Sequence, residues 1–266
     1  MLACLSVAFV AAEQSTTRAQ TSGQAGAQAG APTGGQTATK PATDAAVAPA
    51  VEQILDRYVK AIGGREAWQK FTSRVTMGTI EVPSMNLSGM VMIHEKAPDR
   101  LLATVVINGA SFRQGFDGTL GWTDDPQDGL RDQSGAELAE TRRDADFYHP
   151  LDLRRLYTKF TVTGTEKIGE RETYVLVATV PEGSEPTRMY FDTETGLLLR
   201  AVSQHHGADG VTQYREDFED YRDVDGIKVP FTSHQTNGDT TYTMTISEVR
   251  HNVELDDSEF AKPTVQ

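Results

Sequence analysis

Apolar side chains near the start of the folded part of the chain follow the spacing of an amphipathic helix. From Ala50 to Ile62 they recur at i, i+3, i+4 and i+7, and Gly63-Gly64 predicts the end of this helix. Arg65 to Lys70 predicts a second, short helix that turns Trp68 and Phe71 inward. The apolar face of the first helix consists of Val51, Ile54, Leu55, Tyr58, Val59 and Ile62.

Beyond these helices the pattern changes to the alternation of half-buried strands. In Thr240 to Ser247 the apolar side chains lie on one face and the hydroxyls on the other, which predicts a sheet with one buried face. A capping box from Ser134 to Glu137 predicts a further helix through Asp144. We expect about ten or eleven antiparallel strands and about three helices, and a sheet of this size must curl. These strands come from twelve candidate segments, which are 74–82, 87–95, 101–108, 111–116, 120–124, 160–168, 173–180, 187–192, 197–204, 213–222, 232–236 and 240–251.

The first of these strands form a meander joined by short turns. Gly89 to Ile93 is apolar, and Lys96-Ala97-Pro98 ends the strand because proline has no N–H to give to the ladder. After the next strand, Asp117 to Trp122 begins with an Asp-Gly hairpin signal, and Asp125-Pro126 follows as a corner.

In this order and spacing, these elements resemble the LolA/LolB-like periplasmic lipoprotein-carrier family, which sorts outer-membrane lipoproteins. Asp256 to Pro263 looks like the closing Asp-x-x-x-Phe segment of that family. The resemblance covers roughly residues 50 to 263. It implies an α+β fold, in which a curled antiparallel sheet forms an unclosed half-barrel with helices over its concave face. It also implies non-catalytic binding or carrying of a hydrophobic ligand, such as lipid or lipoprotein acyl chains.

One position departs from the family pattern. Members have an Arg directly before the turn proline, linked to holding and releasing lipoprotein, whereas this chain has Ala97 there and Lys96 one position earlier. A shift of one residue in a strand points a side chain to the opposite face. The resemblance therefore supports the fold more strongly than it supports lipoprotein transfer.

The N-terminal residues predict export. Leu2 to Ala12 is an apolar run that suits a signal peptide and is too short to span a bilayer, so we expect a signal peptide over residues 1–19. The positively charged residues that normally precede the apolar run of a signal peptide are missing, which indicates that the start codon was assigned too late. Cys4, the only cysteine, falls inside the predicted signal peptide. Residues 20–49, rich in Ala, Gln, Gly and Thr, predict a disordered linker, and residues 50–266 a single domain in the periplasm.

The net charge of −13 argues against nucleic acid as a partner and against adsorption to anionic lipid. We expect a monomer whose partner is a lipid, a lipidated polypeptide or another envelope protein. No catalytic motif is recognisable, and we expect no enzyme activity, no metal and no cofactor. His205-His206 fits a loop better than a metal pair. The acidic residues Glu137, Glu140, Asp144, Asp146 and Asp152 fit solvated helix faces better than a calcium site.

Methionine is the remaining unusual feature. Met77, Met85, Met90 and Met92 fall close together, and Met suits apolar surfaces that accept ligands of varied shape. We therefore predict an apolar cavity. A filled core would instead make the domain an interaction module, and an acid–base pair inside it would indicate a hydrolase. The predicted cavity residues are Met77, Met90, Met92, Leu102, Val105, Phe116 and Trp122.

Overall fold

The computed structural model describes residues 49–179, 186–207 and 210–264, without the side chains of residues 205–210. The predicted signal peptide (1–19), with Cys4, lies outside the described residues. So does the predicted linker (20–49), apart from its last residue, and so do the side chains of His205 and His206.

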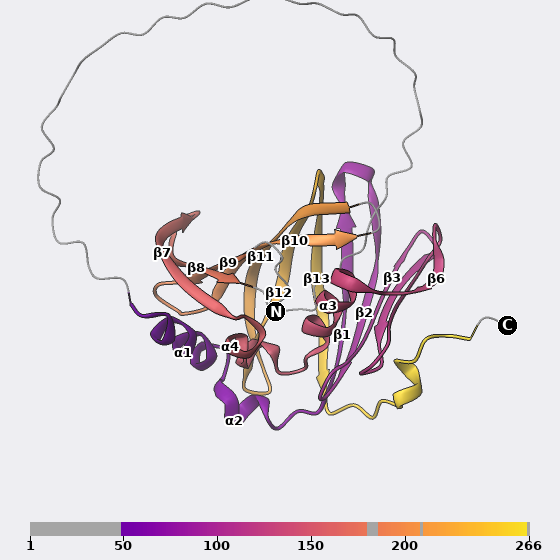
Figure 1. The fold of residues 1–266 in the computed structure, drawn as a ribbon, viewed down its shortest axis with the longest axis horizontal. Helices are drawn as coiled ribbons and strands as arrows, with labels where there is room; N and C mark the ends of the chain where they lie inside the picture. Colours follow the sequence, from indigo (N-terminus) through magenta and orange to yellow (C-terminus); the bar gives the residue numbers. More distant parts are fainter. Residues whose placement is uncertain (1–48, 180–185, 208–209, 265–266) are drawn as a thin grey trace, which may run out of the picture. The chain divides into compact units, whose positions relative to one another are not determined.

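The described residues form one sheet with a few short helices (Figure 1). The α-helices are α1 (Val51–Ala61), α2 (Gly64–Trp68), α3 (Gly135–Ala145) and α4 (Leu153–Leu156), and the 3-10 helices are η1 (Pro83–Met85), η2 (His149–Leu151) and η3 (Asp257–Glu259). The strands are β1 (Ser73–Val82), β2 (Leu87–Lys96), β3 (Arg100–Ile107), β4 (Ala110–Phe116), β5 (Gly121–Asp125), β6 (Gly129–Asp132), β7 (Lys159–Ile168), β8 (Arg171–Thr179), β9 (Thr187–Asp192), β10 (Leu198–Gly207), β11 (Gly210–Val224), β12 (Ile227–Asn237) and β13 (Thr240–His251).

The sheet consists of two meanders joined along one seam. The strand order is β6-β5-β4-β3-β2-β1-β13-β12-β11-β10-β9-β8-β7, and the neighbouring strands pair antiparallel. β1 and β13 form the seam between the two meanders. β6 and β7 are the two edges, and they do not pair with each other in the described part of the chain, so the sheet is not closed.

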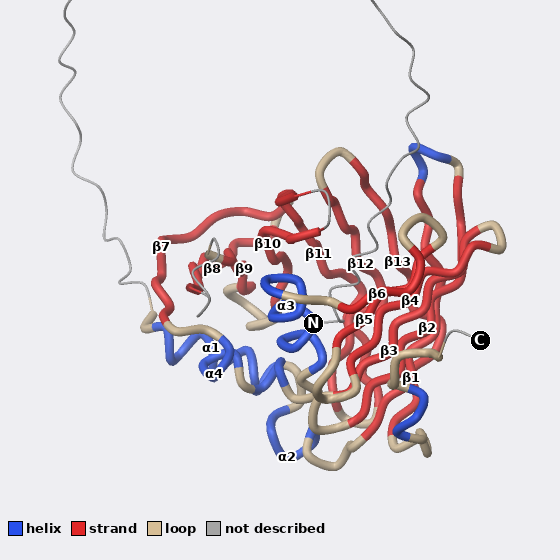
Figure 2. Tube along the Cα trace, turned by 45° about the vertical axis from the view of Figure 1, so that its right-hand side comes forward, coloured by secondary structure: helices blue, strands red, loops and turns tan. Residues whose placement is uncertain are grey.

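Helix α3 shows how strongly the sheet curls. It contacts β3, β4 and β5 in one meander and β10 in the other, although these strands are far apart in the strand order. In Figure 2, α3 lies between the β9–β10 side and the β5–β6 side of the sheet. The expected α+β fold, an unclosed half-barrel with helices over its concave face, is therefore confirmed.

The face that carries the helices, which we call the inner face, holds most of the buried apolar side chains. Along β3, Leu101, Ala103, Val105 and Ile107 are at most 4% exposed, while the residues between them are partly exposed. α1 packs its own buried face, including Leu55, on this side. Period-two alternation thus builds the core, as the sequence predicted.

The last described residues cover part of the opposite, outer face. Leu255 and Phe260 of this C-terminal segment (residues 253–263) form a buried cluster with Val75. The indole Nε1 of Trp122 donates a hydrogen bond to the Phe260 carbonyl oxygen at 3.0 Å. The Lys96 ammonium donates to the Leu255 carbonyl oxygen at 2.7 Å. The closing Asp-x-x-x-Phe motif is therefore an anchor on the outer face.

Two strands differ from the sequence-based predictions. β6 was not predicted, because it has only four residues and follows a turn in which Asp125 accepts two backbone N–H groups. β12 was predicted to begin at residue 232, yet it begins at Ile227 and contains Pro230. Pro230 pairs with Tyr221 of β11. The residue before Tyr221 is Asp220, whose φ of 51° interrupts the β11–β12 ladder, so a residue without an N–H is tolerated at this point.

Candidate ligand-binding site

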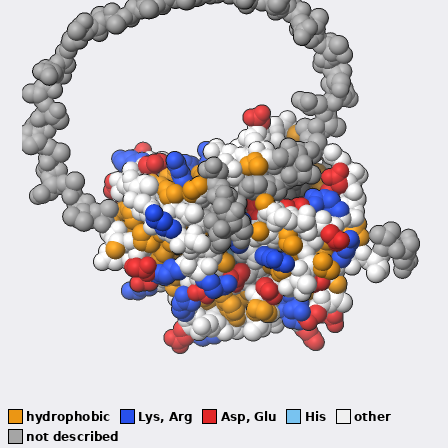
Figure 3. All heavy atoms as spheres, viewed as in Figure 1, with side chains coloured by type: hydrophobic (Ala, Val, Ile, Leu, Met, Phe, Trp, Pro, Cys, Tyr) orange, Lys and Arg blue, Asp and Glu red, His pale blue; other side chains and the backbone are white. Residues whose placement is uncertain are grey.

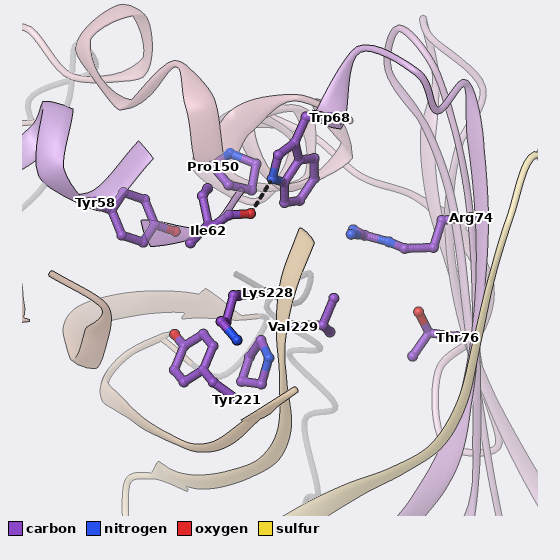
Figure 4. A pocket seen from close by; sticks show the side chains of 10 residues that line it. Tyr58, Ile62, Trp68, Arg74, Thr76, Pro150, Tyr221, Lys228 and Val229 are labelled. Carbon is purple, nitrogen blue, oxygen red and sulfur yellow. Dashed lines mark hydrogen bonds between the residues drawn. The ribbon is translucent and has the colours of Figure 1, made fainter. Parts of the chain in front are cut away.

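A pocket lies between the helices of the inner face and three strands of the sheet. Residues of α1, its C-cap, α2 and η2 form one wall, and residues of β1, β11 and β12 form the others (Figure 4). The free space between them is about 20 Å³, enough for about one water molecule. The pocket is lined by Tyr58, Ile62, Trp68, Arg74, Thr76, Pro150, Tyr221, Lys228, Val229 and Pro230.

The local sequence positions the helical wall. The ring of Tyr58 lies on the buried face of α1 and meets Phe191 edge-on, with 5.2 Å between centroids. Gly63 ends α1 with φ of 110°, and a Cβ there would clash with the Gly226 carbonyl oxygen in the β11–β12 turn. The turn brings Trp68 back, so that its indole Nε1 donates to the Ile62 carbonyl oxygen at 3.0 Å (Figure 4).

Arg74 on β1 is the charged centre of the pocket. Its guanidinium donates to both carboxylate oxygens of Glu95, at 2.7 and 2.6 Å, and the two side chains are only 7% and 6% exposed. The guanidinium carbon lies 5.6 Å from the ring centroid of Trp68 and 5.7 Å from that of Phe147. Burial and the Arg74 charge hold the pKa of nearby His149 well below its usual range. Arg74 thus ties two strands and two parts of the helical cover together.

Three other polar side chains of the pocket, those of Lys228, Tyr58 and Tyr221, can donate hydrogen bonds. Lys228 is half-buried, and its side chain forms no ion pair with any described residue. Burial raises the pKa of the Tyr58 hydroxyl, which therefore keeps its proton. The Tyr221 hydroxyl donates to the Leu198 carbonyl oxygen at 2.7 Å. The lining includes two cations and no carboxylate.

A buried polar group lies elsewhere on the inner face. The Gln235 amide donates to Glu216 Oε1 and to Ser233 Oγ, both at 2.9 Å, and these three residues are at most 3% exposed. Burial raises the pKa of Glu216 to about 7. Phe218 is buried as well, and Glu216 lies two residues earlier in β11 and so points to the same face.

Comparison with known proteins identifies the architecture. No family model and no curated protein matches this sequence. Solved structures do match. A DUF1329 family protein from Desulfovibrio piger has a TM-score of 0.53 at 16% identity, over 79% of this chain and 97% of that one. A LolA superfamily protein from Nitrosomonas europaea has a TM-score of 0.52 at 14% identity, over 81% and 99%. The chain has a LolA-like fold.

A third match is a putative outer membrane lipoprotein-sorting protein domain from Vibrio parahaemolyticus. Its TM-score is 0.52 at 15% identity, over 79% of this chain and 94% of that one. At these identities the likeness concerns the LolA-like fold alone, so the chemistry of the site rests on the residues of this chain.

The LolA-like sheet does not bring the seven predicted cavity residues together. Val105 and Phe116 are buried on the inner face, at 0% and 2% exposure. The strand pairing places the other five on the outer face, because a period of two sends neighbours to opposite sides. Met90 and Met92 are 67% and 43% exposed there. The outer-face residues are Met77, Met90, Met92, Leu102 and Trp122.

Substitutions at neighbouring positions of β2 should separate the two faces. Met92→Glu should change the free energy of unfolding by at most about 0.5 kcal/mol, because its side chain already contacts water. Val91→Glu should cost several kcal/mol, because Val91 is 3% exposed and a carboxylate there is buried without a partner. Urea denaturation of both variants measures this. Equal losses would contradict the placement of Met92 on the outer face.

Lys96, the basic residue two positions before the turn proline, lies on the outer face of the sheet. Lys96 donates to Leu255 and forms an ion pair with Asp257 at 2.7 Å, so it holds the C-terminal segment on the outer face. The buried cation of the inner face is Arg74, on the neighbouring strand, and it pairs with Glu95. Lys96 and Arg74 therefore lie on opposite faces of this sheet.

The acidic residues near α3 are distributed among separate interactions. Glu137 pairs with Arg131 at 2.8 Å, Asp152 pairs with Arg65 at 2.6 Å, and Asp146 pairs with an arginine of α4. Among the described residues, no three His, Cys, Asp or Glu side chains come together as a metal site. No helix in the described ranges has the length and apolar character needed to cross a bilayer.

The pocket residues were not identified as a site from the sequence. Tyr58 and Trp68 were correctly expected to point inward, but only as core residues. Arg74 and Lys228 are isolated basic residues in strands, about 150 positions apart in the chain. Only the pairing across the seam between the two meanders brings these strands near each other. No local signal in the sequence carries that information.

Proposed function

We propose that this protein binds and carries a hydrophobic ligand, a lipid or the acyl chains of a lipidated polypeptide, in the bacterial cell envelope, without catalysing a reaction. The observation that carries this proposal is the inner face itself. Most of its buried side chains are apolar in both meanders, and the sheet curls around it so that a single helix contacts both sides. An acyl chain placed there contributes about 0.8 kcal/mol for each buried CH₂ group.

The helical cover supports the same function, because it is unevenly anchored. α1 buries Ile54, Leu55 and Tyr58, whereas α3 buries only Thr141 and Ala145. Side-chain hydrogen bonds hold α3 to the strands of one meander, from the Gln114 amide to the Thr141 hydroxyl at 2.7 Å and from the Arg131 guanidinium to the Glu137 carboxylate at 2.8 Å. Since the described pocket holds only about one water molecule, an acyl chain must displace part of the cover. When it moves, α3 loses less buried apolar surface than α1 does.

The experiment is native mass spectrometry of the protein purified from its host envelope. We expect a second mass series, displaced from the apoprotein by the mass of a lipid or acyl group. Denaturing spray of the same sample should collapse it to the apoprotein mass. Delipidated protein mixed with a fatty acid should regain the shift. Absence of the shift in both samples would contradict the proposal.

A second candidate function is an interaction module that docks a protein of the envelope. The exposed methionines Met90 and Met92 favour it, because they form an apolar patch beside the C-terminal segment on the outer face. In that case the mass shift would match a polypeptide, and Met92→Glu would abolish it. A carrier that uses the inner face would keep its lipid in the same variant.

A further inference from the structure

We propose that the pocket between the helices and β1, β11 and β12 is a head-group site for an anion, and that the hydrophobic ligand is an amphiphile with an anionic end. This inference deepens the proposed function and rests on it. It names the chemical class of the ligand, an alkyl chain that ends in a carboxylate or phosphate, and it assigns Lys228 as the residue that pairs with that end.

The charge of the pocket lining is the first argument. The whole chain has 38 acidic and 25 basic side chains, yet the ten lining residues include Arg74 and Lys228 and no Asp or Glu. The Arg74 charge is compensated by Glu95, which accepts hydrogen bonds from two of its nitrogens. The Lys228 charge has no such partner among the described residues. The pocket thus has a net positive charge that a bound anion would compensate.

The placement of Lys228 is the second argument. Its backbone N–H donates to the Ile62 carbonyl oxygen at 3.1 Å, so β12 is held against the end of α1. In Figure 4 the Lys228 side chain lies between the helical wall with Tyr58 and the sheet wall with Tyr221. The Tyr58 hydroxyl, kept protonated by burial, is a second donor from the opposite wall. An ammonium and a hydroxyl facing one space suit a carboxylate or phosphate oxygen.

The surroundings of these donors are the third argument. Ile62, Trp68 and Val229 give the pocket apolar walls, and the pocket lies on the same inner face as the apolar core. Removing water from around an ion pair strengthens the attraction between its charges. The free space of about 20 Å³ admits one oxygen atom of a carboxylate or phosphate, and it does not admit an alkyl chain. The alkyl part of the ligand therefore extends from this pocket along the inner face.

The chain provides its own optical probe for this site. It contains two tryptophans, Trp68 in the pocket and Trp122 on the outer face under Phe260. In the full-length Trp122→Phe variant, tryptophan emission reports on the pocket alone. Dodecanoate, dodecyl phosphate, dodecanol and dodecyltrimethylammonium are titrated into this variant, with isothermal titration calorimetry in parallel. Circular dichroism melting confirms that each variant is folded.

We expect both anionic amphiphiles to bind and to change Trp68 emission, and the cationic one to bind at least about 10-fold more weakly. Lys228→Ala should weaken dodecanoate binding by about 10-fold and leave dodecanol unchanged, while Lys228→Arg should restore most of the affinity. Lys167→Ala, an exposed lysine on β7, serves as the matched control and should behave like the parent. The ratio of dodecyl phosphate to dodecanoate affinity distinguishes a phosphate from a carboxylate head group.

The failures of the two proposals are distinguishable. Equal binding of dodecanoate and dodecanol, unaffected by Lys228→Ala, would overturn the anion site and leave the carrier function standing. If no alkyl compound binds, the carrier function fails. In that case butyrate, which has almost no chain, still tests the pocket: quenching of Trp68 that depends on Lys228 supports the anion site, and its absence overturns it.

Discussion

Arg74→Ala should lower the free energy of unfolding by about 3–5 kcal/mol. The substitution leaves the Glu95 carboxylate buried without its cation and removes two hydrogen bonds, at 2.7 and 2.6 Å. It also removes the cation–π contacts of the guanidinium with the rings of Trp68 and Phe147. Urea denaturation followed by circular dichroism measures the loss.

Two control variants separate the buried charge from lost packing. Arg74→Met combined with Glu95→Leu removes both charges and should recover most of the stability, because a buried ion pair is often no better than apolar residues of similar volume. Arg113→Ala breaks a pair with Asp124 whose members are 37% and 28% exposed, and it should lower stability by no more than about 1 kcal/mol. If Arg74→Ala is no worse than Arg113→Ala, the buried pair does not stabilise the fold as argued.

Glu216→Gln should raise the free energy of unfolding above that of the parent at pH 8. This gain should be roughly 2–3 kcal/mol larger at pH 8 than at pH 5. Burial raises the pKa of Glu216 from 4.5 to about 7. Between these values the folded state binds more protons than the unfolded state, so the stability of the parent falls as the pH rises through 7. A glutamine cannot ionise, and its carbonyl oxygen can still accept the hydrogen bond from Gln235.

Urea denaturation at pH 5 and pH 8 gives both values for parent and variant. Burial also raises the pKa of Asp144 on α3, and repulsion from Glu140 and Glu216 raises it too, so this acidic group of the cover contributes to the same trend. Glu172→Gln is the control, because Glu172 is exposed on β8 and forms no ion pair with any described residue, and it should leave the pH dependence of the parent unchanged. A gain at pH 5 as large as that at pH 8 would contradict a raised pKa at Glu216.

Local patterns in the sequence predicted the elements of this fold well. The helix that begins after Ala50 and ends at Gly63, the inward turn of Trp68 and the alternation of β13 follow from residues close together in the chain. The prediction that the barrel is unclosed rested on the family resemblance, because the spacing of residues alone does not tell which strands form the edges of the sheet. The motif at residues 256–263 was correctly singled out, but its role in covering the outer face depends on contacts with β1 and β5.

The site was predicted less well, because it depends on which face each strand residue takes. Grouping the methionines by closeness in sequence placed Met90 and Met92 in a cavity, while their strand partners place them on the outer face. Val91, between them, is the buried residue. Apolar residues occur at both kinds of position in β2, so polarity did not fix the register. Pairing with β1 and β3 fixes it.

The seam between β1 and β13 has a consequence for how the chain reaches its native state. Each meander is made of strands that follow one another in sequence, so each can assemble through short loops. The seam is different: Ser247 donates to the Met77 carbonyl oxygen across 170 positions of the chain. Closing so long a loop is entropically unfavourable, and such contacts slow folding. Because β13 follows all the other described strands in the chain, β1 keeps one edge unpaired until β13 has been made, and a partner that holds unfolded chains could bind this edge during that time.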